Sequence, residues 1–308
     1  MSKKRLLVLG NSYMDFVAKV RRAPERLERV ISNQEHIIMP GGFGIISAVT
    51  SSGLDTDTVL CTRLGDDETG RKLMATLEQS NVDRRFVVTD KRKESGVNAI
   101  TVEDGYKART ITFPGANNSI CFDDIESSFT SYPDAFMLST EMREELVRDA
   151  IKFSNSSNVP VILSCGSEGK NFDFDNIGNV KIFLPNREAT YRITGIDPVD
   201  ANTALHACVK LVNSLKCEYV VIKLGQRGTF VFDGVYSQII PVHNVETVDY
   251  TGVETIFDAA LASSYLEFED INKAAIFANA AASYSISKDG AFTSIPTLDD
   301  VKNMFDNR

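Results

Sequence analysis

Short, continuous apolar runs alternate along the chain with stretches long enough to form helices. The first run, Arg5–Gly10, is closed by a glycine and is typical of a strand buried on both faces of a parallel sheet. Strand-like runs separated by helical segments indicate β-α-β units, so the pattern predicts an α/β fold with a parallel central sheet. The later runs are Thr56–Leu64, Ala135–Leu138, Val159–Leu163, Lys181–Leu184 and Glu218–Leu224.

Helices are predicted after several of these runs. A glycine turn at Pro40–Ala48 leads into a helix that should end near Gly53. The sequence GDDETG begins a second helix, which should end near Gln79. Two long apolar helices are expected near the end of the chain, at about Gly252–Glu267 and Asp270–Ser287.

A second, smaller sheet is expected beside the main one. Asp104-Gly105 separates the alternating runs Val97–Val102 and Lys107–Phe113, which is a strong hairpin signal. Together with strands from the charged segment after the first run, this hairpin predicts a lid formed by about 12–38 and 85–115. No repeat or low-complexity linker interrupts the chain, so residues 1–308 are predicted to form one domain carrying that lid.

Composition limits the classes of partner that the protein is expected to bind. The chain has 308 residues and a net charge of -9, with a pI near 5.0, which argues against nucleic acid as the main partner. The apolar run after the N-terminal basic residues is too short for a signal peptide, and no 18-residue apolar span exists. We therefore expect a cytoplasmic protein without a membrane partner.

The cysteines and histidines predict neither disulfides nor a zinc site. The five cysteines are scattered, with no C-x-x-C spacing, and the three histidines lie far apart. Such an odd, dispersed set is typical of reduced thiols in a core. A metal held by histidine and cysteine is not expected.

The stretch Asp249–Ala260 carries the first candidate chemistry. Its turn ends at Gly252 and runs directly into an apolar helix. Free backbone N–H groups and the positive end of the helix dipole converge at such a point, so this layout predicts a phosphate cradle.

Seven short motifs lie along nearly the whole chain. They are PGGFG at 40–44, RLGDDETG at 63–70, FPGAN at 113–117, LPNREATYRITG at 184–195, KLGQRG at 223–228, VDYTG at 248–252 and KDGAFTSIP at 288–296. Taken together, they resemble the motifs of the ribokinase (PfkB carbohydrate kinase) family. The resemblance implies an αβα sandwich with a β lid, ATP and Mg²⁺ as cofactors, and transfer of the γ-phosphoryl group to a hydroxyl of a sugar or nucleoside. It also makes a homodimer through the lid an expectation.

The cradle departs from the family pattern D-T-T-G-A-G-D. Gly252 is kept, but Thr255 stands at the position of the base aspartate and Glu254 at the second anion-hole glycine. A hydroxyl is a poor proton acceptor near neutral pH, and a carboxylate there repels phosphate. Asp258, three residues further on, is either a rescuing base or a charged residue on a helix face. Glu254 as a displaced base is a further alternative.

The acceptor end is altered as well. The resemblance places Asp15 where a carboxylate holds two sugar hydroxyls, and Tyr13 where the family has asparagine. The family's turn GGKGAN reads GGFGII here and begins with Gly41 and Gly42. Phe43 therefore replaces the family's lysine, and Ile46 replaces its asparagine. Apolar groups here suit a flatter, less polar ligand, or they fill the cleft.

The family's N-x-x-E motif, associated with magnesium and phosphate, is only half present. Asn186 is kept, but Ala189 stands where the glutamate belongs, and Glu188 comes one residue early. One residue on a helix is a rotation of about 100°, so Glu188 should point elsewhere.

The nucleotide end matches the family better. Lys223, Gly225 and Gly228 correspond to the nucleotide-side loop, and Asn279 to a nucleotide contact on the penultimate helix. The two glycines could equally be kept for the turn they form.

A monovalent cation such as K⁺ is also implied. Asp249, Ser285, Lys288 and Gly290 match positions that often surround one in the family.

Three functions remain open from the sequence. The first is an ATP-dependent kinase with an unusual site, and the second is an impaired or inactive homologue, a pseudokinase that still binds a nucleotide or metabolite. The third is an interaction protein whose cleft is closed by its own side chains. Loss of both base and anion hole favours the second.

Overall fold

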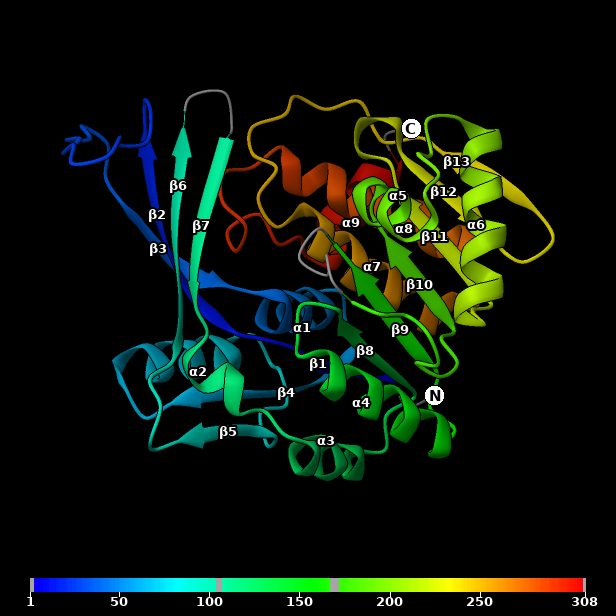
Figure 1. The fold of residues 1–308 in the computed structure, drawn as a ribbon, viewed down its shortest axis with the longest axis horizontal. Coiled ribbons are helices and arrows are strands. Elements are labelled where there is room, and N and C mark those ends of the chain that lie inside the picture. Colours follow the sequence, from blue (N-terminus) through cyan, green and yellow to red (C-terminus); the bar gives the residue numbers. More distant parts are fainter. Residues whose placement is uncertain (1–2, 104–106, 167–171, 307–308) are drawn as a thin grey trace.

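The computed structural model describes residues 3–103, 107–166 and 172–306. Within these residues, nine strands form one large sheet (Figure 1). Its strands are parallel except for β12 and β13, which are antiparallel to their neighbours. In sheet order they are β13 (Ser237–Ile240), β12 (Thr229–Phe232), β11 (Tyr219–Lys223), β10 (Ile182–Pro185), β9 (Val161–Cys165), β8 (Ala135–Ser139), β1 (Arg5–Leu9), β4 (Asp57–Gly65) and β5 (Val87–Asp90).

Helices cover both faces of this sheet, because successive side chains of a strand point to opposite faces. Leu6 and Val8 of β1 belong to one buried cluster, and Leu7 and Leu9 belong to the other. The first cluster is completed by α1 (Phe43–Gly53), α2 (Glu68–Gln79), α7 (Val253–Phe268), α8 (Ile271–Ile286) and α9 (Leu298–Asp306), and the second by α3 (Phe122–Ser128), α4 (Glu144–Ser156), α5 (Arg187–Thr194) and α6 (Ala201–Leu215).

The predicted α/β sandwich is confirmed. Every apolar run that the sequence marked as a strand forms one, with ends that differ by one or two residues. The runs are buried because both faces of a parallel sheet are covered by helices. The two long helices expected near the end of the chain are α7 and α8, which lie on the same face of the sheet.

A smaller sheet stands apart from the large one. Its central pair, β2 and β6, is parallel, and each of these strands has an outer antiparallel neighbour. The predicted hairpin is confirmed as β6 and β7, although its turn at 104–106 lies outside the described residues. In sheet order the strands are β3 (Ile37–Gly41), β2 (Tyr13–Val20), β6 (Gly96–Glu103) and β7 (Lys107–Phe113).

The boundaries of this small sheet differ from the predicted segments 12–38 and 85–115. Strand β3 continues to residue 41, and residues 87–90 form β5, which pairs with β4 at the edge of the large sheet. The sequence pattern did not separate β5 from the small sheet because β5 is only four residues long.

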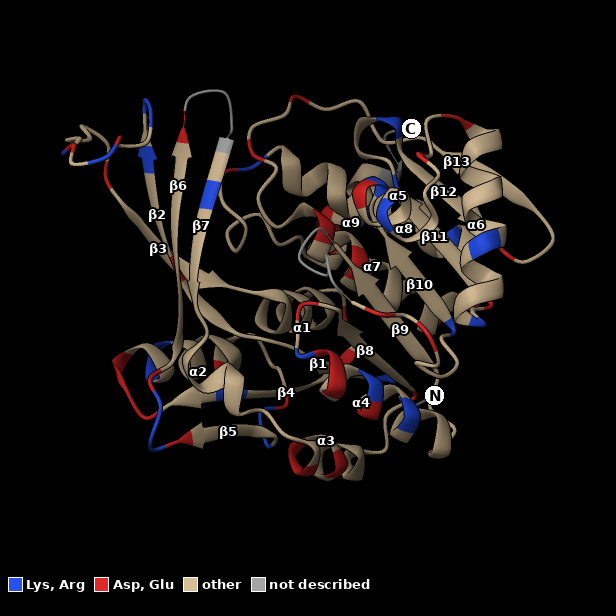
Figure 2. Cartoon of the chain, in the orientation of Figure 1, with Lys and Arg blue, Asp and Glu red and all other residues tan. Residues whose placement is uncertain are grey.

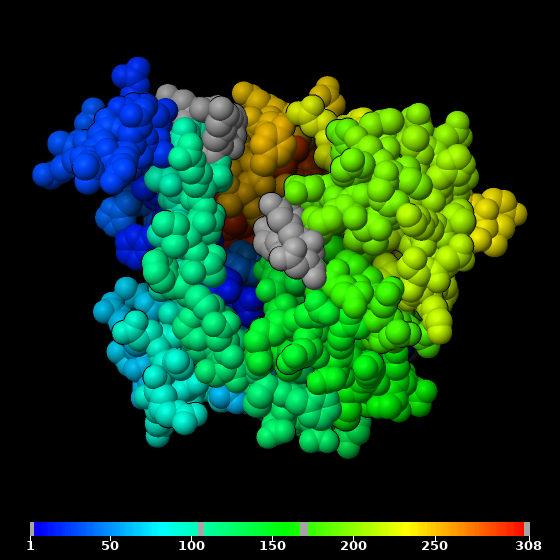
Figure 3. All heavy atoms as spheres, in the orientation of Figure 1, coloured from blue at the N-terminus to red at the C-terminus, as the bar shows by residue number. Residues whose placement is uncertain are grey.

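The space-filling view shows a hollow between the small sheet and the main body (Figure 3).

Candidate functional site

The carboxyl edge of the large sheet carries most of the predicted site. Lys223 ends β11, and Asn186 follows β10 directly. In parallel strands these ends meet at one edge, where open α/β sheets place their ligands. The glycine turn before α1 and the start of α7 reach the same edge. Among the cavities that open there are one toward the small sheet, one toward α8 and a smaller one at the start of α7.

The start of α7 lies in the small central cavity of about 260 Å³. Gly252 precedes the helix with a φ of 76°, and a Cβ added there would lie 2.7 Å from the Cβ of Ala291. Glycine is therefore required at this turn. The other residues lining the cavity include Phe43, Glu141, Ser164, Asn186, Lys223, Glu254, Thr255 and Asp258.

Glu254 contacts the two residues that were expected to serve the nucleotide. The Asn186 Nδ2 atom lies 3.2 Å from each carboxylate oxygen of Glu254. Lys223 Nζ lies 3.6 Å from its Oε2 atom. The carboxylate thus draws both donors to itself in the first turn of α7, where it also meets the positive end of the helix dipole.

Asp258 is neither an open base nor a residue on an exposed helix face. Its side chain is 1% exposed, and Lys223 Nζ lies 2.7 and 2.9 Å from its two oxygens. Ser164 Oγ donates a hydrogen bond of 2.5 Å to the same carboxylate. Burial raises the pKa of Asp258 to about 6, against the opposing effects of Lys223 and Ser164. Both oxygens are committed, which argues against the rescue role.

Lys223 consequently lies inside the protein. Its side chain is 8% exposed, and its ammonium group is shared between Asp258 and Glu254. The sequence placed this lysine in the nucleotide loop, and the structure adds an ion pair that holds β11 against α7.

Asp15 faces the cavity of about 550 Å³ that lies beneath the small sheet. It is 6% exposed and accepts a hydrogen bond of 2.8 Å from Asn98 Nδ2. A Cβ at Gly41 would lie 1.9 Å from its Oδ2 atom, so this glycine makes room for the carboxylate. The cavity walls are largely apolar and include Val17, Met39, Ile100 and Val102.

The remaining residues expected at the acceptor end are buried. Tyr13 packs so tightly that a Cβ at Gly42 or Gly96 would lie within 2.7 Å of its ring. Burial, followed by the charges of Glu141 and Asp15, raises the pKa of Tyr13 to about 12. Phe43 is 3% exposed and lines the small central cavity. Ile46 is 2% exposed and belongs to the core, so its predicted contact with a ligand is not supported.

The Asp15→Asn variant should change how stability depends on pH. Burial raises the pKa of Asp15 from 3.8 to about 6. The stability contributed by this proton is fully present below pH 4 and is lost as pH rises through 6. Relative to the wild type, we expect the free energy of unfolding of the variant to increase by about 2–3 kcal/mol from pH 4 to pH 7.5. Urea unfolding of both proteins across this range measures it, and a constant difference would contradict the assignment.

The nucleotide-side cavity, about 610 Å³, lies between the turn after β11 and helix α8. Gly225 and Gly228 line it with positive φ angles of 60° and 91°. A Cβ at Gly228 would lie 2.1 Å from the carbonyl oxygen of Ile240. Asn279 is 2% exposed and accepts a hydrogen bond from Thr229 Oγ1 at 2.7 Å. These residues shape the cavity wall and also hold the fold.

The N-x-x-E remnant has a structural role. Asn186 caps α5, with its Oδ1 atom accepting a 2.8 Å hydrogen bond from the backbone N–H of Ala189. The Ala189 side chain is fully buried, whereas Glu188 is exposed, as the helical rotation predicted. Glu188 reaches the rim of a neighbouring surface cavity but does not replace the missing glutamate.

Three of the residues expected around a monovalent cation, Asp249, Ser285 and Gly290, form hydrogen bonds within the protein. Asp249 Oδ2 accepts a hydrogen bond of 3.0 Å from the Gly290 backbone N–H. Its Oδ1 atom accepts bonds of 2.9 and 2.7 Å from the N–H and hydroxyl of Thr251. Ser285 Oγ lies 2.8 Å from Ser294 Oγ. These hydrogen bonds leave further lone pairs on the carboxylate and hydroxyl oxygens, so the K⁺ site stays a prediction.

Three polar residues of the site escaped the sequence analysis. Glu141 and Ser164 line the small central cavity, and Asn98 binds Asp15. Ser164 lies in β9 and Glu141 just after β8. Because the carboxyl ends of parallel strands meet, their positions in the chain could have placed both at the site.

Charged side chains are scattered over the molecule in Figure 2 and do not gather into one basic face in that view. None of the helices in the described ranges is long and apolar enough to cross a membrane.

The sequence profile of the pfkB family of carbohydrate kinases matches residues 3–298. The chain is 25% identical to ribokinase of Bacillus subtilis over 308 residues, covering 98% of this chain and 99% of that one. It is 26% identical to a bifunctional ribokinase/ribose-5-phosphate isomerase A of Fructilactobacillus sanfranciscensis, covering 98% of this chain but 56% of that longer protein. Its fold is that of Arabidopsis thaliana ribokinase complexed with ribose and ATP, with a TM-score of 0.83, 24% identity, and coverage of 98% of this chain and 99% of that one.

Proposed function

The chain belongs to the pfkB family of carbohydrate kinases, and from this membership we propose that it binds a nucleotide and a small hydroxyl compound while its phosphoryl transfer is impaired. The observation that carries the proposal is the position of Glu254. Its carboxylate accepts a hydrogen bond from Asn186 and pairs with Lys223. These contacts lie at the start of the helix, where a transferred phosphoryl group would need positive charge. A negative charge there opposes the γ-phosphate.

The group at the base position supports the same proposal. Thr255 carries a hydroxyl, which does not accept a proton near neutral pH as a carboxylate does. The carboxylate of Asp258 cannot replace it without giving up Lys223 and Ser164. Both losses fall on one turn of α7, so they act on the same chemical step.

Two cavities of suitable size support the binding part of the proposal. We assign ATP to the cavity beside α8 and a sugar or nucleoside to the cavity under the small sheet. No cluster of three or more His, Cys, Asp or Glu that could hold a metal occurs in the described part of the chain. Mg²⁺ would therefore be bound mainly by the nucleotide phosphates, a common arrangement in kinases.

The Glu254→Gln variant tests the effect of the charge on the nucleotide. Glutamine keeps the shape and a hydrogen-bonding group but removes the negative charge. We expect the variant to bind Mg·ATP about tenfold more tightly than the wild type, and the gain for ADP to be smaller because ADP lacks the γ-phosphate. Calorimetric titrations of both proteins measure the affinities. Equal affinities of the two proteins for ATP would contradict the proposed repulsion.

An active kinase with a rearranged site is the second candidate. It is favoured by Glu141, a carboxylate that lines the same small cavity as Thr255. This candidate predicts turnover by the wild-type protein without any substitution on α7.

We further propose that the chain forms a homodimer in the cytoplasm through the outer face of its small sheet. Strand register places Ile38, Phe16, Ala99 and Ile111 in one row across this sheet. Three of them are large and apolar, with 45–64% exposed. A row of this kind is typical of an interface. The five cysteines, all within the described residues, form no disulfide with one another, which suits a reducing compartment.

The Ile111→Asp variant tests the dimer. A carboxylate placed in an apolar interface loses its hydration, so we expect the variant to be monomeric at concentrations where the wild type is dimeric. Sedimentation velocity distinguishes the two states. Tyr132→Asp is the matched control, since Tyr132 is an exposed aromatic residue outside this sheet. A monomeric wild type, or a dimer that Ile111→Asp leaves intact, would contradict the proposal.

A further inference from the structure

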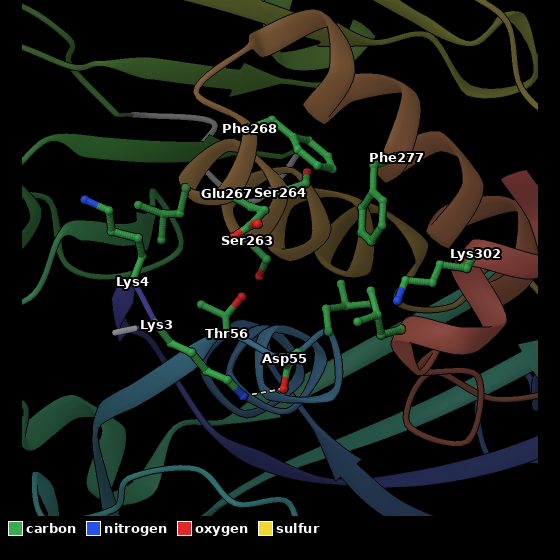
Figure 4. A pocket seen from close by; sticks show the side chains of 13 residues that line it. Lys3, Lys4, Asp55, Thr56, Ser263, Ser264, Glu267, Phe268, Phe277 and Lys302 are labelled. Atoms are coloured by element: carbon green, nitrogen blue, oxygen red, sulfur yellow. Dashed lines mark hydrogen bonds and ion pairs between the residues drawn. The ribbon is translucent and has the colours of Figure 1, made fainter. Parts of the chain in front are cut away.

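A separate cavity of about 570 Å³ opens at the amino edge of the large sheet (Figure 4). Lys3 and Lys4 precede β1, and Thr56 precedes β4, so this edge is opposite to the one that carries the candidate site. The C-terminal half of α7 and parts of α8 and α9 close the other sides. The volume lies within the range of cavities that bind small molecules.

Aromatic and aliphatic side chains form much of its wall. The rings of Phe268 and Phe277 meet edge to face, with centroids 6.2 Å apart. Leu54, Leu266 and Leu298 add to the apolar surface. Such a wall suits a flat apolar group, which would stack or pack against the two rings.

One cation points into this cavity. Lys302 extends its ammonium group inward from α9 (Figure 4), and it forms no ion pair within the described ranges. By contrast, Lys3 pairs with Asp55, and Lys4 pairs with Asp134. Two acidic residues line the cavity, Asp55 and Glu267. Asp55 is paired with Lys3, and Glu267 is exposed.

A buried hydroxyl provides an independent indication of a ligand. Ser263 of α7 is 5% exposed, and its Oγ atom has no hydrogen-bond partner among the described residues. Figure 4 shows this hydroxyl pointing toward Thr56 across the cavity. Leaving a buried hydroxyl unpaired lowers folding stability, so a partner that the chain itself does not supply is expected.

We propose that this cavity binds a small organic anion with a flat apolar body. The apolar body lies against Phe268 and Phe277, the anionic group meets Lys302, and an oxygen of the ligand accepts the Ser263 hydroxyl. None of these residues lines a cavity of the candidate site, so the proposal does not depend on the proposed function.

Phenyl phosphate is the probe for this site, because it combines a ring with an anion. We expect calorimetric titration of the full chain, with excess Mg·ATP present, to show saturable binding at about 1 mM or tighter, as for a ligand of this size. Inorganic phosphate and phenol each carry half of the chemistry and should bind at least about tenfold more weakly. Absence of binding, or displacement by ATP, would overturn the proposal.

Charge reversal locates the bound anion. We expect Lys302→Glu to weaken phenyl phosphate binding about fivefold or more, since an attraction becomes a repulsion. Lys273→Glu is the matched control, because Lys273 is exposed on the neighbouring helix α8 and lines none of these cavities. Equal binding by the Lys302→Glu variant and the control would overturn the site.

The Ser263→Ala variant separates a binding role from a structural one. Removing an unpaired buried hydroxyl should raise Tm by about 1–3 °C, so the variant is expected to fold. The same change should weaken phenyl phosphate about two- to tenfold through loss of one hydrogen bond. A purely structural serine would not give these opposite effects, and unchanged binding would overturn the assignment of Ser263.

Discussion

Replacing Thr255 by aspartate and Glu254 by glycine in the same chain is expected to raise the kcat of phosphoryl transfer by about 10²–10⁴. The aspartate supplies a proton acceptor at the start of α7, inside the small central cavity. The glycine removes the carboxylate that holds Asn186 and Lys223, and it frees the positive end of the helix for phosphate. Transfer of labelled γ-phosphate from ATP to ribose and to ribonucleosides measures the gain.

A matched double variant isolates the base. Thr255→Asn with Glu254→Gly has the same shape as the first variant but lacks the carboxylate, so it should gain nucleotide affinity without gaining the full rate. Thr255→Asp alone should gain less than the pair, because Glu254 remains beside the new carboxylate and the two charges repel. If the aspartate and asparagine double variants had equal rates, position 255 would not be the place where the catalytic base is missing.

The Lys223→Met variant is expected to lose about 3–5 kcal/mol of unfolding free energy at pH 8. Asp258 is 1% exposed, and without Lys223 its charge keeps only the Ser164 hydroxyl as a partner. Acidification protonates this carboxylate, so the loss should shrink as pH falls toward 5. Urea unfolding at the two pH values measures both effects.

Two further variants make this test specific. Lys223→Met combined with Asp258→Leu removes both charges and should recover most of the lost stability, because a buried ion pair can be replaced by apolar side chains. Lys273→Met removes an exposed lysine and should change stability by less than about 0.5 kcal/mol. If Lys223→Met behaved like Lys273→Met, the buried pair would not contribute to stability.

The sequence predicted the fold well because the signals for strands and helices are local. Apolar runs such as Arg5–Gly10 identify buried strands without knowledge of their neighbours. The boundary of the small sheet was harder to predict. Residues 87–90 form a short strand whose assignment depends on pairing with β4, which is a contact between distant segments.

Contacts between distant segments also explain what the site prediction missed. Asp258 lies one turn beyond Thr255 in any helix, but its burial follows from Lys223 and Ser164, which come from two different strands. Ile46 aligned with a polar position of the family, yet it packs into the core against the large sheet. The motif gave the position in the chain, and tertiary packing determined which side chains reach a cavity.

The turnover of the wild-type protein tests the central claim most directly. Purified protein is incubated with Mg·ATP and each of a set of pentoses and ribonucleosides, beside the Thr255→Asp, Glu254→Gly variant as a positive control. The account predicts a wild-type kcat at least about 10²-fold below the roughly 1–100 s⁻¹ of kinases, with clear turnover by the variant for at least one acceptor. A wild-type kcat within the kinase range would contradict it and would establish an active kinase with a rearranged site.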